Sequence, residues 1–169
     1  GLLAADPLKE VGGLIQRRSG RTYLSFPNRY PSDKELATLP KMRIDSVDLD
    51  ARLLVGPGFE WLSKKCIGLS SVRLRNCNSK ASNSLALIAR IATLAELDVS
   101  GRPDISHMVA SLRRSRTVTK LRFRTRLPAD FAVKLPLKTK VLDLQNSTVH
   151  ANSLAGISRL KRLRELDLT

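Results

Sequence analysis

The sequence is short of aromatic residues, cysteines and acids, and each shortage narrows what the chain can be. Aromatic side chains make up 4% of the 169 residues, which predicts an aliphatic, shallow core and few rings for stacking nucleic-acid bases. Two cysteines do not make a disulfide framework. Cys66 and Cys77 are expected at opposite ends of one strand, too far apart to bridge. No apolar run approaches the roughly 18 residues of a membrane-spanning helix, so we predict no transmembrane segment.

The residues that carry most enzyme chemistry are also sparse. The two histidines, His107 and His150, have no cysteine or carboxylate at metal-ligand spacing, which argues against a metal site. Neither a glycine-rich phosphate loop nor a nucleophile elbow is present. Asp48 and Asp50 resemble a carboxylate pair, but Arg73 is the expected neighbour. We therefore predict a protein that is not an enzyme and binds no cofactor, no metal and no small-molecule substrate.

One six-position pattern, apolar-x-x-apolar-x-apolar, recurs along most of the chain. Its second apolar residues fall 25, 25, 24, 21 and 24 residues apart, counting from Val47 to Leu166. A fixed period in this range is typical of leucine-rich repeats, in which each unit contributes one strand and one helical return. The chain thus resembles the leucine-rich repeat superfamily, and we expect an α/β solenoid with a curved parallel sheet and short helices on its convex side. The copies are Ile44-Val47-Leu49, Leu69-Val72-Leu74, Leu94-Leu97-Val99, Val118-Leu121-Phe123, Thr139-Leu142-Leu144 and Leu163-Leu166-Leu168.

The expected solenoid divides into two parts. Residues 1–20 carry Leu8, Val11 and Ile15 at helical spacing, which predicts an N-terminal helical cap. Residues 21–169 are expected to form a repeat domain of six to seven divergent repeats. The sequence stops just after a strand, so we expect the C-terminal cap to be missing or supplied by a partner.

Helical returns are expected between the strands. Residues 82–92 predict one such return, with the apolar side chains of Leu85, Ile88, Ala89 and Ala92 on one stripe. Pro128 and Pro136 bracket the shortest return, which leaves room for one or two turns. Asn152 and Ser153 are expected to cap the last one.

Charged residues alternate in sign on the exposed face of the expected sheet. Between the last two apolar positions of each copy stands a residue that points away from the core, because successive strand residues face opposite sides. Neighbouring strands lie about 4.8 Å apart, so opposite charges would form either a stabilising ladder or a mixed-charge docking face for a protein. The candidates for contact with a protein are Asp48, Arg73, Asp98, Asp143 and Asp167.

The chain is strongly basic. Thirty lysines and arginines oppose fifteen acids, a formal net charge of +15, which favours a polyanionic partner, either nucleic acid or an anionic membrane surface, or compensation by acidic neighbouring subunits. Most bases precede a strand, so stacked repeats would align them as a ridge along one edge of the sheet. Bases at helix C-termini also complement the helix dipole, so a solvated or protein-contacting edge is the alternative to phosphate contact. RNA contact without aromatic residues would be non-sequence-specific. The phosphate-contact candidates are Lys64, Lys65, Arg90, Arg113, Arg114, Arg116, Arg122, Arg124, Arg126, Lys134, Lys138, Lys140, Arg159, Lys161, Arg162 and Arg164.

A second resemblance is confined to a short stretch near the start of the repeats. Residues 43–50 (Arg-Ile-Asp-Ser-Val-Asp-Leu-Asp), then Gly58-Phe59 and residues 72–77 (Val-Arg-Leu-Arg-Asn-Cys), resemble the opening of the mitochondrial ATP synthase subunit s-like (distal membrane arm assembly) group. Members of that group are small, non-catalytic repeat proteins of the mitochondrial matrix. The resemblance implies a mitochondrial matrix location and a role in assembly or structure.

These observations favour a non-catalytic scaffold subunit of a large mitochondrial ribonucleoprotein assembly, such as the mitochondrial ribosome. The basic edge would contact the RNA backbone, and the concave sheet face would hold proteins. The alternative is an accessory or assembly factor of a respiratory complex or of the ATP synthase, where the charge would serve the matrix or the anionic inner membrane surface. A substrate-adaptor repeat protein is a third interpretation, although no adaptor motif is visible.

Overall fold

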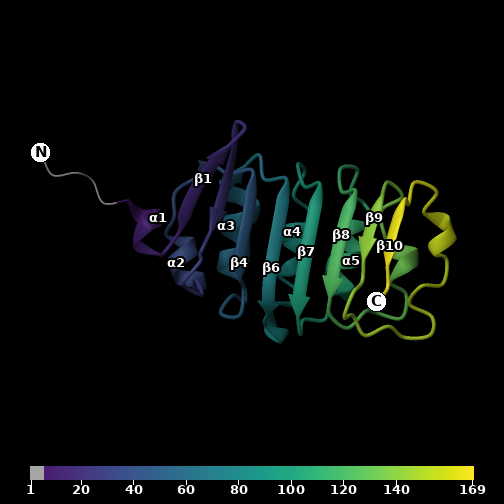
Figure 1. Cartoon of the computed structure of the whole chain (residues 1–169). Helices are drawn as coiled ribbons and strands as arrows, with labels where there is room; N and C mark the ends of the chain where they lie inside the picture. Colours follow the sequence, from purple (N-terminus) through teal and green to yellow (C-terminus); the bar gives the residue numbers. More distant parts are fainter. Residues whose placement is uncertain (1–5) are drawn as a thin grey trace, which may run out of the picture.

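A long β-sheet runs through the whole protein. The computed structural model describes residues 6–169. The main sheet has eight strands in the order β1-β2-β4-β6-β7-β8-β9-β10, and a small second sheet pairs β3 with β5 (Figure 1). Strands β1 and β2 pair antiparallel, and the other neighbouring strands are parallel. The strands are β1 (Leu14–Arg18), β2 (Arg21–Ser25), β3 (Met42–Arg43), β4 (Ser46–Asp50), β5 (Cys66–Ile67), β6 (Ser71–Cys77), β7 (Glu96–Gly101), β8 (Lys120–Arg124), β9 (Val141–Asp143) and β10 (Glu165–Asp167).

The repeating apolar pattern sets the register of the parallel strands. The second apolar residue of each copy lies opposite the second apolar residue of the next, so equivalent positions form one row across the sheet. This confirms both the parallel α/β sheet and the register expected from the sequence. In order across the sheet, the row is Leu24, Val47, Val72, Leu97, Leu121, Leu142 and Leu166.

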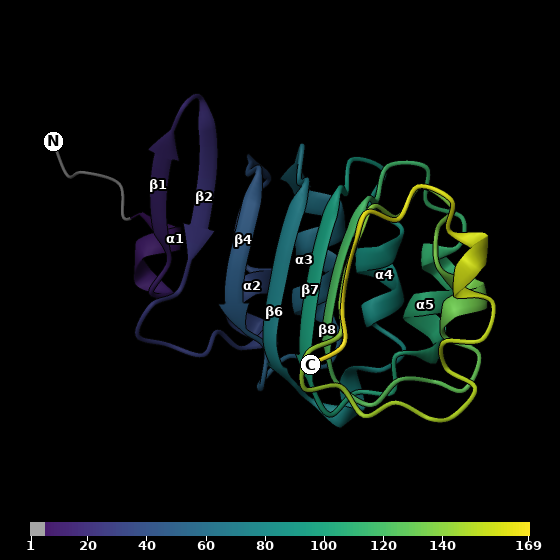
Figure 2. The same ribbon diagram turned by 45° about the vertical axis from the view of Figure 1, so that its right-hand side comes forward.

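Short helices cover one face of the main sheet and leave the other face open (Figure 2). A capping box begins α2, where Ser32 and Glu35 each accept a hydrogen bond from the other's backbone N–H. The longest helix is α3 with nine residues, and the last two returns contain only 3₁₀ turns of three residues each. The helices are α1 (Pro7–Glu10), α2 (Asp33–Ala37), α3 (Pro57–Lys65), α4 (Leu85–Ala89) and α5 (Ser106–Leu112), with 3₁₀ turns η1 (Ser79–Ala81), η2 (Ala132–Lys134) and η3 (Ile157–Arg159).

The last two returns differ in how well they match expectation. The return between Pro128 and Pro136 contains the single turn η2, as the two prolines predicted. The last return is not a capped helix, because Gly156 adopts φ +80° and interrupts it before η3. Ser153 Oγ accepts a hydrogen bond from the backbone N–H of His150 at 3.1 Å and so closes a turn instead of capping a helix.

The prediction of a helical cap over residues 1–20 is wrong for most of that range. Residues 1–5 lie outside the described residues, α1 is one turn long, and residues 14–18 form β1. Gly12 at φ +80° ends α1. Ser19 and Gly20, at φ +50° and +76°, then close a two-residue hairpin that pairs β1 with β2. The end of the sheet is therefore capped by an antiparallel hairpin.

The core between the sheet and the helices is mainly aliphatic and contains a few buried aromatic side chains. Phe123 and Phe131 meet edge to face with ring centroids 5.5 Å apart. Burial falls away at one end of the sheet. Leu97 is 2% exposed, whereas the equivalent Leu166 in β10 is 44% exposed.

This difference predicts unequal costs for one substitution at two equivalent positions. Leu97→Ala should lower the free energy of unfolding by about 2–5 kcal/mol, because it leaves a cavity in the core. Leu166→Ala should cost less than about 1 kcal/mol, because half of that side chain is already hydrated. Urea unfolding followed by circular dichroism measures both. Equal costs would contradict the packing described above.

Candidate functional site

The open face of the main sheet carries a ladder of alternating charges. The residues between the last two apolar positions pair in register, from Ser25 beside Asp48 to Asp143 beside Asp167. Arg73 contacts Asp48 at 3.7 Å and Asp98 at 3.5 Å. The alternation expected from the sequence is confirmed from Asp48 to Asp143, and Asp167 in β10 then lies beside Asp143 with the same sign. The ladder residues are Asp48, Arg73, Asp98, Arg122, Asp143 and Asp167.

The ladder is tightest at Asp143 and loosest at Asp98. Arg122 Nε lies 2.9 Å from Asp143, a charge-assisted hydrogen-bond distance, but Arg122 Nη1 lies 3.8 Å from Asp98. Burial therefore raises the pKa of Asp98, and the two long contacts with Arg73 and Arg122 lower it by less. Exposed cross-strand pairs of this kind contribute only about 0.2–1 kcal/mol each.

A second cluster anchors the C-terminal ends of β4 and β6. Both carboxylate oxygens of Asp50 accept hydrogen bonds from Arg52, at 2.9 and 2.8 Å, and Asn76 Nδ2 donates to Asp50 at 2.7 Å. Arg52 also lies over the Tyr30 ring, 3.8 Å from its centroid. Burial raises the pKa of Asp50, but the hydrogen bonds from Arg52 and Asn76 outweigh it and hold the pKa below its ordinary value. This cluster holds the ends of the two strands together, and it occupies Asp50, one of the few acids of the chain.

Several predicted phosphate-contact residues already have partners. Arg122 and Arg124 contact Asp143 on the sheet, and Lys134 Nζ lies 2.6 Å from Asp130. Arg126 Nε donates to His150 Nε2 at 3.3 Å. These basic side chains are therefore partly engaged in contacts within the protein.

Arg159 departs most from the expectation of a free basic residue. Its Nη2 donates to the backbone carbonyls of Ala132, Val133 and Leu135, at 3.0, 2.7 and 2.8 Å. These carbonyls lie in η2 and at its C-cap. Ala132 O also accepts from Leu135 N at 3.3 Å, whereas the residue three beyond Val133 is Pro136, which has no N–H to donate. Arg159 is half-buried and ties η3 to η2, so it does not belong to an exposed ridge.

The remaining bases gather where the parallel strands begin, which we call the strand-start edge. Backbone hydrogen bonds link the residues just before successive strands into one row. Arg164 N donates to Lys140 O at 2.8 Å, Lys140 N to Thr119 O at 2.7 Å, and Thr119 N to Ala95 O at 2.9 Å. Lysines and arginines far apart in sequence therefore lie side by side.

Five of these bases make up what we call the start-edge cluster. No carboxylate of the described residues lies within 4.0 Å of their charged groups, and four of them line one hollow of about 450 Å³. The four are Lys140, Lys161, Arg162 and Arg164, and Lys138 is the fifth member.

The ridge is confined to one half of the edge and does not run its full length. Residues 113–164 contain fourteen lysines and arginines but two aspartates, a net +12 of the total +15. Before β6 and β7 the equivalent positions are neutral, with Gly68 and Thr93 where Lys138 and Arg162 stand later. Before β4 the equivalent residue is Arg43, which contacts Asp45 at 3.4 Å. Lys64 and Lys65 lie in the last turn of α3, separate from the cluster.

Arg90, Arg113, Arg114 and Arg116 lie at or just beyond the C-terminal ends of α4 and α5. Arg90 and Arg113 are the C-cap residues of the two helices, as helix-dipole complementarity predicted. Arg114 and Arg116 follow α5, and all four are exposed. Sequence reasoning placed these residues on the ridge but did not detect the groove that three of them line, between α4 and α5. The small alanines of the two helices were the available signal.

The part of the chain that the structure describes contains no group of three or more histidines, cysteines or acids able to hold a metal ion, and no helix in it is long and apolar enough to cross a membrane. Cys66 and Cys77 are separate buried thiols, and burial raises the pKa of each to about 12. Comparison of the chain with protein-family models, with curated proteins and with solved structures finds no match.

The opposite pKa shifts of two aspartates predict opposite pH dependences. Because the pKa of Asp50 is lowered on folding, its contribution is present above the ordinary value near 3.8 and is lost as pH falls through the folded pKa. Because the pKa of Asp98 is raised, the folded state binds more protons between 3.8 and the raised value, so Asp98 lowers stability as pH rises through that interval.

Asparagine substitution at the two positions tests this. Asp50→Asn should cost about 1–3 kcal/mol at neutral pH, and the cost should shrink in acid. Asp98→Asn should lower the free energy of unfolding by less than Asp50→Asn at neutral pH. The difference in stability between the wild type and Asp98→Asn should decrease as pH rises. Urea unfolding from acid to neutral pH measures both. A larger cost for Asp98→Asn at neutral pH would contradict the assignment.

Proposed function

We propose that the protein is a non-catalytic scaffold of the leucine-rich repeat solenoid type, which binds the phosphate backbone of RNA at its start-edge cluster. Strands at a near-constant period, in register, with helical returns on one face, support the solenoid assignment. The observation that carries the RNA proposal is the difference in pairing between two sets of bases. Sheet-face arginines meet aspartates, whereas the start-edge cluster meets none.

The chemistry of the cluster favours phosphates over bases. Lysine and arginine are the side chains that neutralise phosphate charge and release its counterions. The aromatic residues nearest in sequence, Phe123 and Phe131, are fully buried and present no ring for stacking. We therefore expect affinity without sequence preference.

The sheet face suits a protein partner. Its charges alternate over one strand spacing, so a polyanion lying along it would meet an aspartate at every other strand from β4 to β9. Arg73, Asp98 and Arg122 border a shallow hollow of about 210 Å³ on this face. A partner with its own mixed-charge surface matches such a pattern in register.

The setting follows from the sequence resemblance alone. Membership of a mitochondrial ribonucleoprotein, such as the ribosome, would account for both the basic cluster and the proposed matrix location. An accessory factor of a respiratory complex or of the ATP synthase is the competing proposal. Co-sedimentation from mitochondrial lysate separates them, since the protein should travel with ribosomal particles in the first case and with membrane complexes in the second.

Charge reversal tests the RNA proposal directly. The variant Lys140→Glu/Arg162→Glu/Arg164→Glu should lose at least about tenfold in affinity for single-stranded RNA, and the slope of log K against log salt should fall by about 2, at about 0.7 per lost phosphate contact. Fluorescence anisotropy over a salt series measures both quantities.

A matched control is available elsewhere on the surface. Lys34, Lys41 and Lys80 are exposed lysines outside the cluster and have no acidic partner among the described residues. Reversing all three changes the net charge by the same amount. An equal loss of RNA affinity in the control would show that net charge, and not the cluster, holds the RNA.

A further inference from the structure

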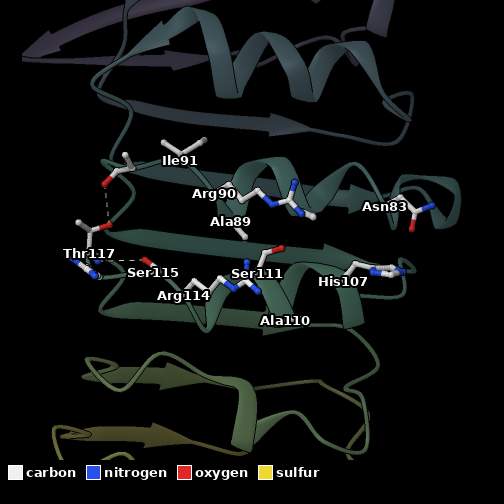
Figure 3. Close-up of a pocket in the computed structure, with 13 residues that line it drawn as sticks. Asn83, Ala89, Arg90, Ile91, His107, Ala110, Ser111, Arg114, Ser115 and Thr117 are labelled. Carbon is white, nitrogen blue, oxygen red and sulfur yellow. Dashed lines mark hydrogen bonds between the residues drawn. The ribbon is translucent and has the colours of Figure 1, made fainter.

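A groove between α4 and α5 lies on the helical face, and none of its lining residues belongs to the start-edge cluster. It has a volume of about 930 Å³ and is the space between two helices that pack side by side (Figure 3). The groove exists because small residues face each other across it. Ala86 and Ala89 come from α4, and Ala110 comes from α5. Its size lies within the range of sites that hold a ligand.

The charged side chains of the groove are all basic. Arg90 and Arg114 extend between the two helices in Figure 3. Arg116, which follows α5 in the chain, also lines the groove. No aspartate or glutamate lines the groove, and none of the three guanidinium groups forms an ion pair or hydrogen bond within the described residues. Ser111 adds an uncommitted hydroxyl. The occupant must therefore supply negative charge.

The floor of the groove decides which anion fits. Ala86 and Ala89 are buried and apolar, and Ile91 is half-buried beside them. A phosphodiester backbone has no apolar side to lay on such a floor, and no aromatic ring lines the groove to stack a base. An amphipathic peptide with acidic and small apolar side chains satisfies the arginines and the floor together.

We propose that the α4–α5 groove docks an acidic amphipathic segment of a partner protein. Its carboxylates pair with Arg90, Arg114 and Arg116, and arginine holds carboxylates in a two-pronged geometry that lysine lacks. Its small apolar side chains cover the alanine floor. This site is independent of the start-edge cluster and assigns Arg90 and Arg114 to protein recognition.

Two labelled peptides of equal charge test the proposal. In the first, glutamates alternate with alanines and leucines in helical register, and in the second, serine replaces every alanine and leucine. The wild type should bind the first more tightly, because only the first covers the floor. Arg90→Glu/Arg114→Glu should weaken that binding at least about tenfold, the scale of one or two lost charged hydrogen bonds. Ala110→Phe should weaken it by filling the groove, without loss of RNA affinity.

Three controls make the outcome decisive. Lys34→Glu/Lys80→Glu carries the same charge change outside the groove and should leave peptide binding unchanged, as should the start-edge triple variant. Unfolding curves of each variant confirm that it folds. The proposal is overturned if the two peptides bind equally, if the control pair weakens binding as much as the arginine pair, or if the arginine pair abolishes RNA binding while the peptide does not bind.

Discussion

Parallel pairing of strands in register is the constraint on which the rest of this protein depends. A strand every 21–25 residues places each apolar residue beside its equivalents, and the helices then have one continuous apolar surface to cover. The same pairing orders the charges. Asp48, Arg73 and Asp98 are 25 residues apart in sequence, yet each is in contact with the next.

Acids are scarce in this chain, and many of them form hydrogen bonds or ion pairs that hold the fold together. Asp33 accepts hydrogen bonds from the backbone of Val55 and Gly58 in the next repeat, at 3.0 and 2.9 Å. Asp45 accepts one from Thr22 at 2.8 Å, and Asp50 holds Arg52. Asp48, Asp98 and Asp143 form ion pairs with arginines of the sheet. Because these acids are engaged elsewhere, the lysines and arginines of the start-edge cluster have no acidic partner among the described residues. Their positive charge therefore remains exposed at that edge.

The sequence predicted features that repeat and failed where the chain is irregular. Strand positions, register and the charge ladder followed from periodicity, because one apolar pattern recurs in every copy. The N-terminal hairpin was missed because Leu8, Val11 and Ile15 mimic helical spacing across a glycine that ends the helix. Arg159 resembled its basic neighbours in sequence, and only the unsatisfied carbonyls of a shortened return explain its inward position. The α4–α5 groove depends on the absence of large side chains, which periodicity does not register.

The ladder and the unpaired bases act over different distances, and this separates their roles. Opposite charges about 4.8 Å apart cancel within a strand spacing, which is shorter than the Debye length of about 8 Å at physiological salt. The alternating part of the ladder, from Asp48 to Asp143, therefore has a short-ranged field, which suits recognition on contact. Lys140, Arg162 and Arg164 carry one sign without acidic partners, so their potential extends to the full screening length and attracts an anion before contact. A polyanionic partner, as proposed above, would therefore meet the strand-start edge first, although arginines are also present on the sheet.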